Sequence, residues 1–256
     1  MNILLNGIRG FMGREVAALC EKGYRGSRLV CGVDVGGDGE DIYTGFDSVP
    51  EGLDIDCIVD FSHHSATLGL LEFATDRSLP VVIATTGHTE EELIAIKEAA
   101  EAVPVFFSAN MSLGVALLVE LAKQAASALP EADIEIIEKH HNRKLDAPSG
   151  TALMIADAIC EARPEAYANV GRSGHGKRTP EEIGIHAVRM GNVVGEHEVI
   201  LSTANQTVTL KHEAHNRALF AEGGLCAAEF LVGKQAGLYD MKSLVEKRDE
   251  SLVGSV

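Results

Sequence analysis

One segment of the sequence combines residue types that can protonate a substrate with residue types that can bind an anion. It runs from Glu138 to Thr151 and reads EKHHNRKLDAPSGT. The candidate proton donors are His140 and Lys144, because imidazole and ammonium groups carry protons that a reacting substrate can take. The candidate anion-binding residues are Ser149, Gly150 and Thr151, which we expect at the start of a helix, where backbone N–H groups have no helical partner. The segment predicts a site that binds and protonates an anionic substrate.

This segment has two other interpretations. A zinc site could combine His140 and His141 with the distant pair His63 and His64. Zinc sites usually have ordered spacings of cysteine, histidine or carboxylate ligands, which these pairs lack, so we expect no metal. A charged, solvated loop without chemistry is the remaining alternative.

A glycine turn near the N-terminus has the pattern of a dinucleotide-binding loop. Gly7, Gly10 and Gly13 form a G-x-x-G-x-x-G sequence directly after the apolar run Ile3–Leu5. Glycines allow a tight turn, close approach of a pyrophosphate to the backbone, and close packing of the following helix on the strand. Asp34 ends the next apolar run, where an acidic residue accepts hydrogen bonds from the adenosine ribose. A plain turn of an α/β protein is the alternative.

Asp34 also bears on the choice of cofactor. A carboxylate at this position repels the 2′-phosphate of NADPH, and residues 35–38 contain no lysine or arginine that could offset it. The sequence therefore predicts that NADH is preferred, with NADPH as the alternative.

The elements that must position these motifs follow from the hydrophobic pattern. Short apolar runs alternate with helical patterns over residues 1–110, as in a parallel sheet covered by helices on both faces. The expected strands are Ile3–Leu5, Leu29–Val33, Ile55–Val59 and Val81–Ala84, and the expected helices are Arg14–Lys22, Thr67–Asp76 and Glu90–Ala102. We expect residues 1–110 to form a Rossmann-like, doubly wound α/β domain that binds the dinucleotide.

Residues 111–216 follow a different pattern. Helices are expected at about 113–129 and 151–161, and strands at 134–138, 185–189, 198–203 and 207–211. Apolar and polar residues alternate in these strands, which is typical of a half-exposed antiparallel sheet. We expect a second, α+β domain with a mostly antiparallel sheet, for substrate binding and oligomerisation. Residues 217–256 begin with a helical pattern and are expected to return to the dinucleotide-binding domain.

Composition argues against several classes of protein. The chain has 22 Lys and Arg against 38 Asp and Glu, a formal charge of −16, which disfavours nucleic-acid binding. The most apolar stretch, residues 113–122, contains Glu120 and is shorter than the ~20 residues that span a bilayer, so we expect no membrane contact. Five widely spaced cysteines predict reduced thiols, and the N-terminal sequence does not have the pattern of a signal peptide. We expect a cytoplasmic protein.

The sequence EKHHNRKLDAPSGTAL, residues 138–153, closely resembles the signature of the 4-hydroxy-tetrahydrodipicolinate reductase (dihydrodipicolinate reductase) family of bacterial lysine biosynthesis. The resemblance extends in order along essentially the whole chain. It includes the glycine turn at residues 7–13 and the segments 60–62, 84–87, 108–112, 194–197 and 237–241. It implies NADH- or NADPH-dependent reduction of 4-hydroxy-tetrahydrodipicolinate, a dicarboxylate, at ring carbon C4 with loss of water, in the diaminopimelate route to lysine. It also implies a homotetramer formed through the second domain.

The resemblance implies roles for single residues. His140 matches the family's proposed acid/base and Lys144 its proposed proton donor, so both are candidates for the main donor. His141 matches a substrate contact, and Ser149, Gly150 and Thr151 match the group that holds a substrate carboxylate. The positions that match dinucleotide contacts are Gly7, Gly10, Phe11, Met12, Gly13, Asp34, Phe61, Ala84, Thr85, Thr86, Gly87, Ser108, Asn110, Met111 and Arg217.

The sequence departs from the family at two positions. The family often has a basic residue where Phe11 and His63 stand, and the loss of charge near the adenosine phosphate adds to the argument for NADH. Two alternatives to the reductase are another two-domain NAD(P)-dependent dehydrogenase and an NADH sensor without turnover. The long signature weighs against the first, and the presence of both His140 and Lys144 weighs against the second.

Overall fold

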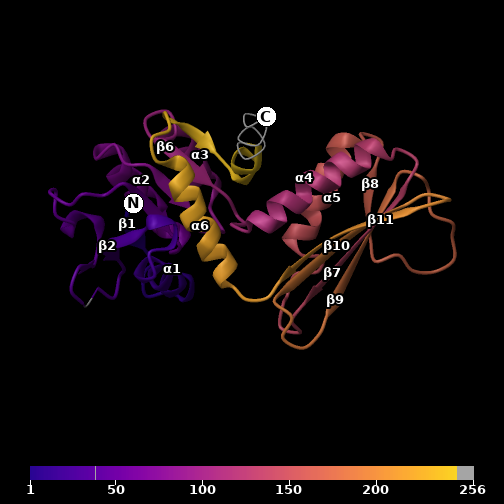
Figure 1. Ribbon diagram of the computed structural model, residues 1–256, viewed down its shortest axis with the longest axis horizontal. Helices are drawn as coiled ribbons and strands as arrows, with labels where there is room; N and C mark the ends of the chain where they lie inside the picture. Colours follow the sequence, from indigo (N-terminus) through magenta and orange to yellow (C-terminus); the bar gives the residue numbers. More distant parts are fainter. Residues whose placement is uncertain (38, 247–256) are drawn as a thin grey trace. The chain divides into compact units, whose positions relative to one another are not determined.

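The computed structural model describes residues 1–37 and 39–246. The chain divides into two units (Figure 1). The first unit combines Met1–Ser112 with the segment that begins at Arg217, and the second unit is Leu113–Asn216.

The first unit is built on a parallel sheet of seven strands in the order β12-β6-β5-β4-β1-β2-β3. The strands are β1 (Asn2–Asn6), β2 (Arg28–Val33), β3 (Ile42–Tyr43), β4 (Cys57–Asp60), β5 (Val81–Ile83), β6 (Pro104–Phe107) and β12 (Gly237–Tyr239). The chain goes outward from β1 to β2 and β3 on one side, and then from β4 to β6 on the other. The order in which the chain adds strands therefore reverses between β1 and β4. Doubly wound sheets bind nucleotides at such a reversal of strand order.

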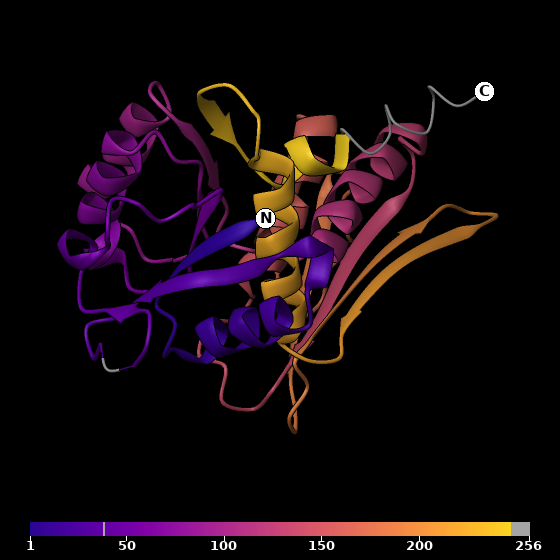
Figure 2. The same cartoon turned by 60° about the vertical axis from the view of Figure 1, so that its left-hand side comes forward.

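Helices cover both faces of this sheet. They are α1 (Phe11–Glu21), α2 (Thr67–Asp76), α3 (Glu90–Ala99) and α6 (Ala218–Leu231), with short 3-10 turns at η1 (Tyr24–Gly26), η2 (Phe46–Ser48) and η3 (His64–Ala66). Figure 2 shows α2 and α3 on one side of the strands, and α1 packed with α6 on the other side. The predicted Rossmann-like fold is confirmed.

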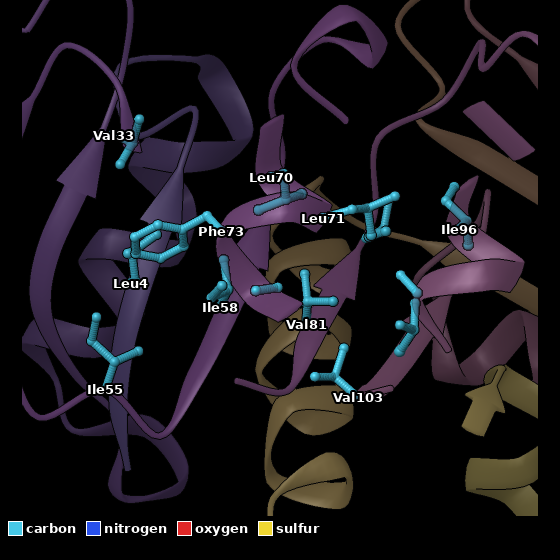
Figure 3. Close-up of a cluster of buried hydrophobic side chains, with 14 of the residues drawn as sticks. Leu4, Val33, Ile55, Ile58, Leu70, Leu71, Phe73, Val81, Ile96 and Val103 are labelled. Carbon is cyan, nitrogen blue, oxygen red and sulfur yellow. The ribbon is translucent and has the colours of Figure 1, made fainter. Parts of the chain in front are cut away.

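Successive side chains of each strand point to opposite faces of the sheet, so apolar side chains pack against the helices on both faces. In the layer under α2 and α3, Leu4 and Ile58 of the sheet pack with Leu70 and Ile96 of the helices, as Figure 3 shows. All four side chains are at most 1% exposed. Ile3 and Leu5 alternate with Leu4 and therefore point to the opposite face of the sheet. Because β1 is buried on both faces, the position of the glycine turn that follows it is fixed.

The second unit places two helices against one face of a five-stranded sheet. The helices are α4 (Leu113–Ala128) and α5 (Gly150–Ala162), and the strands are β7 (Asp133–His140), β8 (Tyr167–Val170), β9 (Glu182–Arg189), β10 (Gly195–Ser202) and β11 (Thr207–Ala214). Leu118 and Ile155 of the helices pack with Ile134, Ile136 and Val199 of the sheet. The opposite face carries half-exposed polar residues such as Glu135 and Lys139.

This second sheet is mixed, whereas the sequence predicted a mostly antiparallel one. Its order is β11-β10-β7-β9-β8, and only β10 pairs antiparallel, with β7 and with β11. The pairs β7 with β9 and β8 with β9 are parallel. The prediction was wrong on this detail because alternation reports that one face is buried and does not report strand direction. The chain crosses over through α5 between β7 and β8, which allows β8 and β9 to run parallel to β7.

Candidate active site

The glycine turn of the first unit forms a tight link between β1 and α1. The backbone N–H of Gly7 donates to the carbonyl of Val33 over 2.8 Å, and that of Gly10 donates to the carbonyl of Gly7 over 3.0 Å. A Cβ atom on Gly7 would lie 2.6 Å from the carbonyl oxygen of Phe61, and φ at Gly7 is +79°. A Cβ atom on Gly13 would clash with the carbonyl oxygen of Gly7. Glycine is therefore required at both positions for the turn to pass this close to its neighbours.

The N-terminus of α1 is suited to an anion. Its first turn has no acidic residue, and its N-cap residue, Gly10, has no side chain that could accept a hydrogen bond from the first N–H groups of the helix. The first backbone N–H groups of a helix carry partial positive charge and lack helical partners. These features, together with the glycines that open the backbone to close approach, fit the pyrophosphate of a dinucleotide.

A pocket of about 630 Å³ lies beside this turn, wholly within the first unit. Among its lining residues are four that the sequence predicted as cofactor contacts, namely Gly7, Gly10, Asp34 and Phe61. Arg9, Thr44 and Ser65 also line it, and the sequence had assigned none of these three to the cofactor. His63, which the sequence analysis placed near the adenosine phosphate, lies in the same lining. Among its lining residues, Arg9 is the one lysine or arginine.

Asp34 is held against the glycine turn. Its Oδ2 accepts a hydrogen bond of 3.0 Å from the backbone N–H of Arg9, and its Oδ1 accepts one of 3.3 Å from that of Gly36. The carboxylate at the end of β2 therefore lies in the pocket wall next to the turn, where a ribose could donate hydroxyl hydrogen bonds to it.

The other predicted cofactor residues of the first unit lie outside this pocket. Ala84, Thr85, Thr86 and Gly87 follow β5, and Ser108, Asn110 and Met111 follow β6. Phe61 follows β4, so three adjacent parallel strands bring these residues to the same edge of the sheet. Phe11 and Met12 lie in the first turn of α1, and the Arg217 guanidinium carbon lies 5.8 Å from the centre of the Phe11 ring.

Some of these residues have a packing role in this structure. Thr85 is 5% exposed, and its hydroxyl accepts a hydrogen bond of 3.0 Å from the backbone N–H of Ser62. Met111 is 2% exposed, and its carbonyl lies where a Cβ atom on Gly223 would be. Thr86 and Gly87, by contrast, are exposed, and Gly87 has φ +85°.

The sequence did not predict the pairing of His64 with Glu92, which lies next to the loop after β5. The Nδ1 atom of His64 lies 3.0 Å from each carboxylate oxygen of Glu92. Oε2 of Glu92 also accepts a hydrogen bond of 2.7 Å from the backbone N–H of Thr89, and these contacts lower the pKa of Glu92. The pairing of His64 in η3 with Glu92 in α3 therefore ties the segment after β4 to the start of α3, where the loop that carries Thr86 and Gly87 ends.

The second unit holds a buried polar network around Glu138 and His140. Both residues lie on the face of β7 that continues the apolar positions Ile134 and Ile136. The Nδ1 atom of His140 lies 2.6 Å from Oε2 of Glu138. Arg189 donates from Nη1 to Oε2 of Glu138 over 2.7 Å and from Nη2 to Oε1 over 2.8 Å. Burial by itself would raise the pKa of Glu138, but the hydrogen bonds it accepts outweigh burial and lower the pKa to about 2.

Ser149 and His197 close the same network. The backbone N–H of Ser149 donates to Oε1 of Glu138 over 2.9 Å, and the Ser149 hydroxyl accepts from the backbone N–H of Ala152 over 3.3 Å. The Ser149 hydroxyl also lies 3.1 Å from Nε2 of His197, whose ring packs edge-on to that of His140 at 5.2 Å. Burial, followed by the charge of His140, lowers the pKa of His197 to about 4.

The three residues that the sequence predicted to bind a carboxylate at the start of α5 differ in their exposure. Ser149 is 2% exposed, and its hydroxyl and N–H both have partners inside the unit. Gly150 is exposed and Thr151 is half-buried, so these two residues present the start of α5 to solvent. Of the three residues that the sequence predicted to bind a carboxylate, Gly150 and Thr151 are therefore more accessible to a ligand than Ser149.

Lys144 and His141 lie in the turn after β7. The Nζ atom of Lys144 pairs with Oδ1 of Asp146 at 2.9 Å, and the backbone N–H of Lys144 donates to the carbonyl of His141 over 3.1 Å. Both side chains of this ion pair retain exposure, 24% for Lys144 and 55% for Asp146. Lys144 is thus held in position and still open to solvent. No group of three or more His, Cys, Asp or Glu side chains in the described residues could hold a metal ion.

The fold and the two sets of residues define the class of the protein. A doubly wound sheet with a glycine turn and a terminal acidic residue on β2 is the architecture of a dinucleotide-binding unit. A second unit that presents a histidine, a lysine and a helix N-terminus provides the groups of an acid/base site for an anionic substrate. The protein is a two-domain, dinucleotide-dependent oxidoreductase.

Comparison with known proteins identifies the family. The N-terminal family model of dihydrodipicolinate reductase matches residues 1–111, and the C-terminal family model matches residues 114–245. The chain belongs to the dihydrodipicolinate reductase family, as its sequence motifs predicted, and is an NAD(P)H-dependent enzyme.

Its similarity to individual members is extensive. It is 47% identical over 251 residues to the 4-hydroxy-tetrahydrodipicolinate reductase of Caldanaerobacter subterraneus subsp. tengcongensis, covering 96% of this chain and 99% of the relative. It is 41% identical to the Clostridium tetani protein of the same name, over 96% and 97% of the two chains. Among solved structures, it superposes on the dipicolinate-bound dihydrodipicolinate reductase of Paenisporosarcina sp. TG-14 with a TM-score of 0.76 and 25% identity, over 94% and 97% of the chains. No helix in the described part of the chain has the length and apolar character needed to cross a membrane.

Proposed function

We propose that this protein reduces 4-hydroxy-tetrahydrodipicolinate to tetrahydrodipicolinate, with loss of water, in the diaminopimelate route to lysine. The observation that carries this proposal is the site in the second unit, where His140, Lys144 and the start of α5 are positioned by one segment, residues 138–151. A relative that carries this activity in its name is 47% identical over nearly its whole length.

The substrate is a dicarboxylate, and the second unit offers two kinds of partner for its negative charge. The backbone N–H groups of Gly150 and Thr151 begin α5, so one carboxylate would bind there. The Lys144 ammonium group lies on the turn that leads to this helix and would neutralise charge that develops during reduction. A dipicolinate-bound relative supports a dicarboxylate as the ligand of this site.

Proton transfer falls to His140 or Lys144. When bound, the reduced nicotinamide supplies the hydride that reaches ring carbon C4, and the 4-hydroxyl leaves as water before or during this transfer. The net reaction needs one proton in addition to the hydride, and the side chain that holds this proton must lie within hydrogen-bond reach of the substrate. His140 is the buried candidate and Lys144 the partly exposed one.

The first unit would hold the dinucleotide by its glycine turn. The start of α1 would bind the pyrophosphate, and Asp34 would accept hydrogen bonds from the adenosine ribose. The loops after β4, β5 and β6 carry the remaining predicted contacts, from Phe61, Ala84–Gly87 and Ser108–Met111, with Arg217 beside Phe11.

We further propose that NADH is used in preference to NADPH. The Asp34 carboxylate in the pocket wall disfavours a 2′-phosphate, whereas the Arg9 side chain in the same wall would attract one. The expected preference is therefore for NADH, with measurable activity for NADPH.

We also propose that the protein is a homotetramer and that it is located in the cytoplasm. The face of the second sheet that α4 and α5 leave uncovered carries the half-exposed residues Glu135 and Lys139 and the exposed residue Lys211. Pairing of such faces would form a homotetramer. The five cysteines carry free thiols, which fits the reducing cytoplasm. Light scattering of the purified protein tests the assembly, since a monomer at micromolar concentration would contradict it.

Turnover of freshly generated 4-hydroxy-tetrahydrodipicolinate tests the activity. Oxidation of NADH that depends on this substrate is the expected result. Binding of NADH without oxidation would favour a sensor, and oxidation with a different amino-acid-derived substrate would favour another two-domain dehydrogenase.

A further inference from the structure

The strongest unassigned feature of the second unit is the burial of a full carboxylate at Glu138. Its side chain is 0% exposed, and three groups donate hydrogen bonds to it: the His140 ring, the Arg189 guanidinium and the backbone N–H of Ser149. A buried carboxylate is costly unless its oxygens are fully paired. Here both oxygens accept two hydrogen bonds each, so the group can stay ionised inside the unit.

An ionised carboxylate accepts hydrogen bonds and cannot donate one. The Nδ1 atom of His140, at 2.6 Å from Oε2 of Glu138, must therefore carry a hydrogen. In the neutral ring this leaves Nε2 as the acceptor, and in the charged ring it leaves Nε2–H as the donor. Either way, the exchangeable site of the ring is Nε2.

The surroundings of Nε2 support this assignment. A Cβ atom on Gly195 would lie 3.1 Å from the Nε2 atom of His140, so a larger residue at position 195 would crowd this nitrogen. No protein hydrogen bond to Nε2 is present in the described residues, whereas Nδ1 is fully engaged. The ring is thus anchored on one side and open to a ligand on the other.

The neighbouring histidine, His197, is a buried ring that has no carboxylate among the described residues bound to its Nδ1 atom, so it can be compared with His140. His197 packs against His140 with ring centres 5.2 Å apart, and its Nε2 faces the Ser149 hydroxyl. Its Nδ1 atom has no hydrogen-bond partner in the described part of the chain. Of the two buried rings, the one with a carboxylate behind it is the one that can carry a positive charge during proton transfer.

We propose that Glu138 is the positioning residue for His140: it fixes the orientation of the ring and keeps a hydrogen on Nδ1, so that Nε2 exchanges the proton with the substrate, while Arg189 holds the Glu138 carboxylate in place. The proposal rests on the function proposed above, in which His140 contacts the substrate. It extends that function by assigning the reacting nitrogen and the two residues that select it.

The first test measures the tautomer of the His140 ring directly and does not depend on turnover. In the full-length protein, long-range ¹H–¹⁵N correlation spectra of His140 should show Nδ1–H as the neutral tautomer at a pH where the ring is neutral. In the isosteric variant Glu138→Gln, the amide group can donate to Nδ1, and the Nε2–H tautomer should gain population. An unchanged tautomer in Glu138→Gln would overturn the proposal.

The second test measures catalysis with a matched control. Glu138→Gln should lower kcat by about 100-fold, with the KM values for the dicarboxylate and for NADH within threefold of the wild type. Glu135→Gln is the control, because Glu135 lies on the same strand and pairs with His186 at 2.8 Å, but on the opposite, half-exposed face. It should keep kcat within twofold. Equal kcat values in Glu138→Gln and the wild type would contradict the positioning role.

Folding and function are separated by two further measurements. Glu138→Asp keeps the negative charge, so it should retain the Nδ1–H tautomer of His140. Its kcat should be at least about tenfold higher than that of Glu138→Gln. If Glu138→Gln shows no cooperative unfolding transition, this variant is not folded, and Glu138→Asp and Arg189→Lys are measured in its place. Wild-type kcat in both of these variants would refute the proposal. If the wild type itself does not turn over 4-hydroxy-tetrahydrodipicolinate, the proposed function fails, while the tautomer spectra still decide whether Glu138 controls the ring.

Discussion

The backbone N–H of Arg9 donates a hydrogen bond of 3.0 Å to Oδ2 of Asp34, which joins the glycine turn after β1 to the acidic residue at the end of β2. Both residues line the same pocket of the first unit. The pocket wall thus contains one carboxylate and one guanidinium group. If the adenosine ribose binds in this pocket, as proposed above, the two groups act in opposite directions on a 2′-phosphate, and substitution of either group should change the cofactor preference.

Replacing Asp34 should shift the preference toward NADPH. In Asp34→Ser, the repulsion of the 2′-phosphate is removed and the ribose loses a charged acceptor, so the ratio of kcat/KM for NADPH to that for NADH should rise at least about tenfold. Steady-state rates with each cofactor measure this ratio. Arg9→Ala is the counterpart and should move the ratio the other way, because it removes the cation. An unchanged ratio in both variants would show that this pocket does not bind the adenosine ribose.

Adding one methyl group to the glycine turn should destabilise the first unit. A Cβ atom on Gly13 would overlap the carbonyl oxygen of Gly7, and both atoms belong to a turn packed between β1 and α1. We expect Gly13→Ala to lower the free energy of unfolding by about 2 kcal/mol or more, measured by urea denaturation.

Gly52→Ala is the control for this substitution. A Cβ atom on Gly52 would meet nothing within 4 Å, and φ at Gly52 is not positive. The change in stability should therefore stay within about 0.5 kcal/mol. Equal effects at positions 13 and 52 would contradict the close approach seen in the turn.

The buried ring of His197 predicts a loss of stability in mild acid. Burial lowers the pKa of His197 from the ordinary 6.5 to about 4. Between these two pH values the unfolded chain binds the proton and the folded protein does not. The stability that this ring contributes is therefore fully present above pH 6.5 and declines as the pH falls toward 4, by about 2 kcal/mol at pH 5.

A comparison of two proteins isolates this contribution. The free energy of unfolding should fall more between pH 7 and pH 5 in the wild type than in His197→Gln, because glutamine does not titrate and can still reach the Ser149 hydroxyl. Parallel pH dependence in the two proteins would show that His197 is not buried in its neutral form.

Removal of the lysine ammonium group should affect the reaction strongly. Lys144→Ala should lower turnover by at least about 100-fold if Lys144 donates the proton or neutralises the developing charge. Lys123→Ala is the matched control, since Lys123 pairs with Glu161 on the surface of the helices. Unchanged turnover in Lys144→Ala would leave His140 as the main donor.

Continuous apolar runs made the parallel sheet predictable. The strands β1, β4 and β5 are buried on both faces, and β2 is buried on both faces over its second half, so each appears in the sequence as an apolar run. Strand β8 was not predicted, because its sequence YANV has three exposed residues and shows no apolar run. The two-residue strand β3 has no pattern of its own and is defined by pairing with β2.

The candidate site was predictable where its residues are adjacent in sequence. His140, Lys144 and the start of α5 come from one segment. Glu138 lies in this segment too, but its partner Arg189 is 51 residues away, and the pairing depends on the register between β7 and β9. His197 reaches Ser149 across 48 residues through the pairing of β10 with β7. No spacing within one strand reveals such contacts, so the network emerges only from the sheet.

The reduction of 4-hydroxy-tetrahydrodipicolinate with a reduced nicotinamide dinucleotide is tested most directly by the initial rate of cofactor oxidation. The substrate is freshly generated, and NADH and NADPH are used at equal concentrations. We predict rapid, substrate-dependent oxidation that is faster with NADH. No oxidation with either cofactor, from folded protein that binds NADH, would contradict the proposed function.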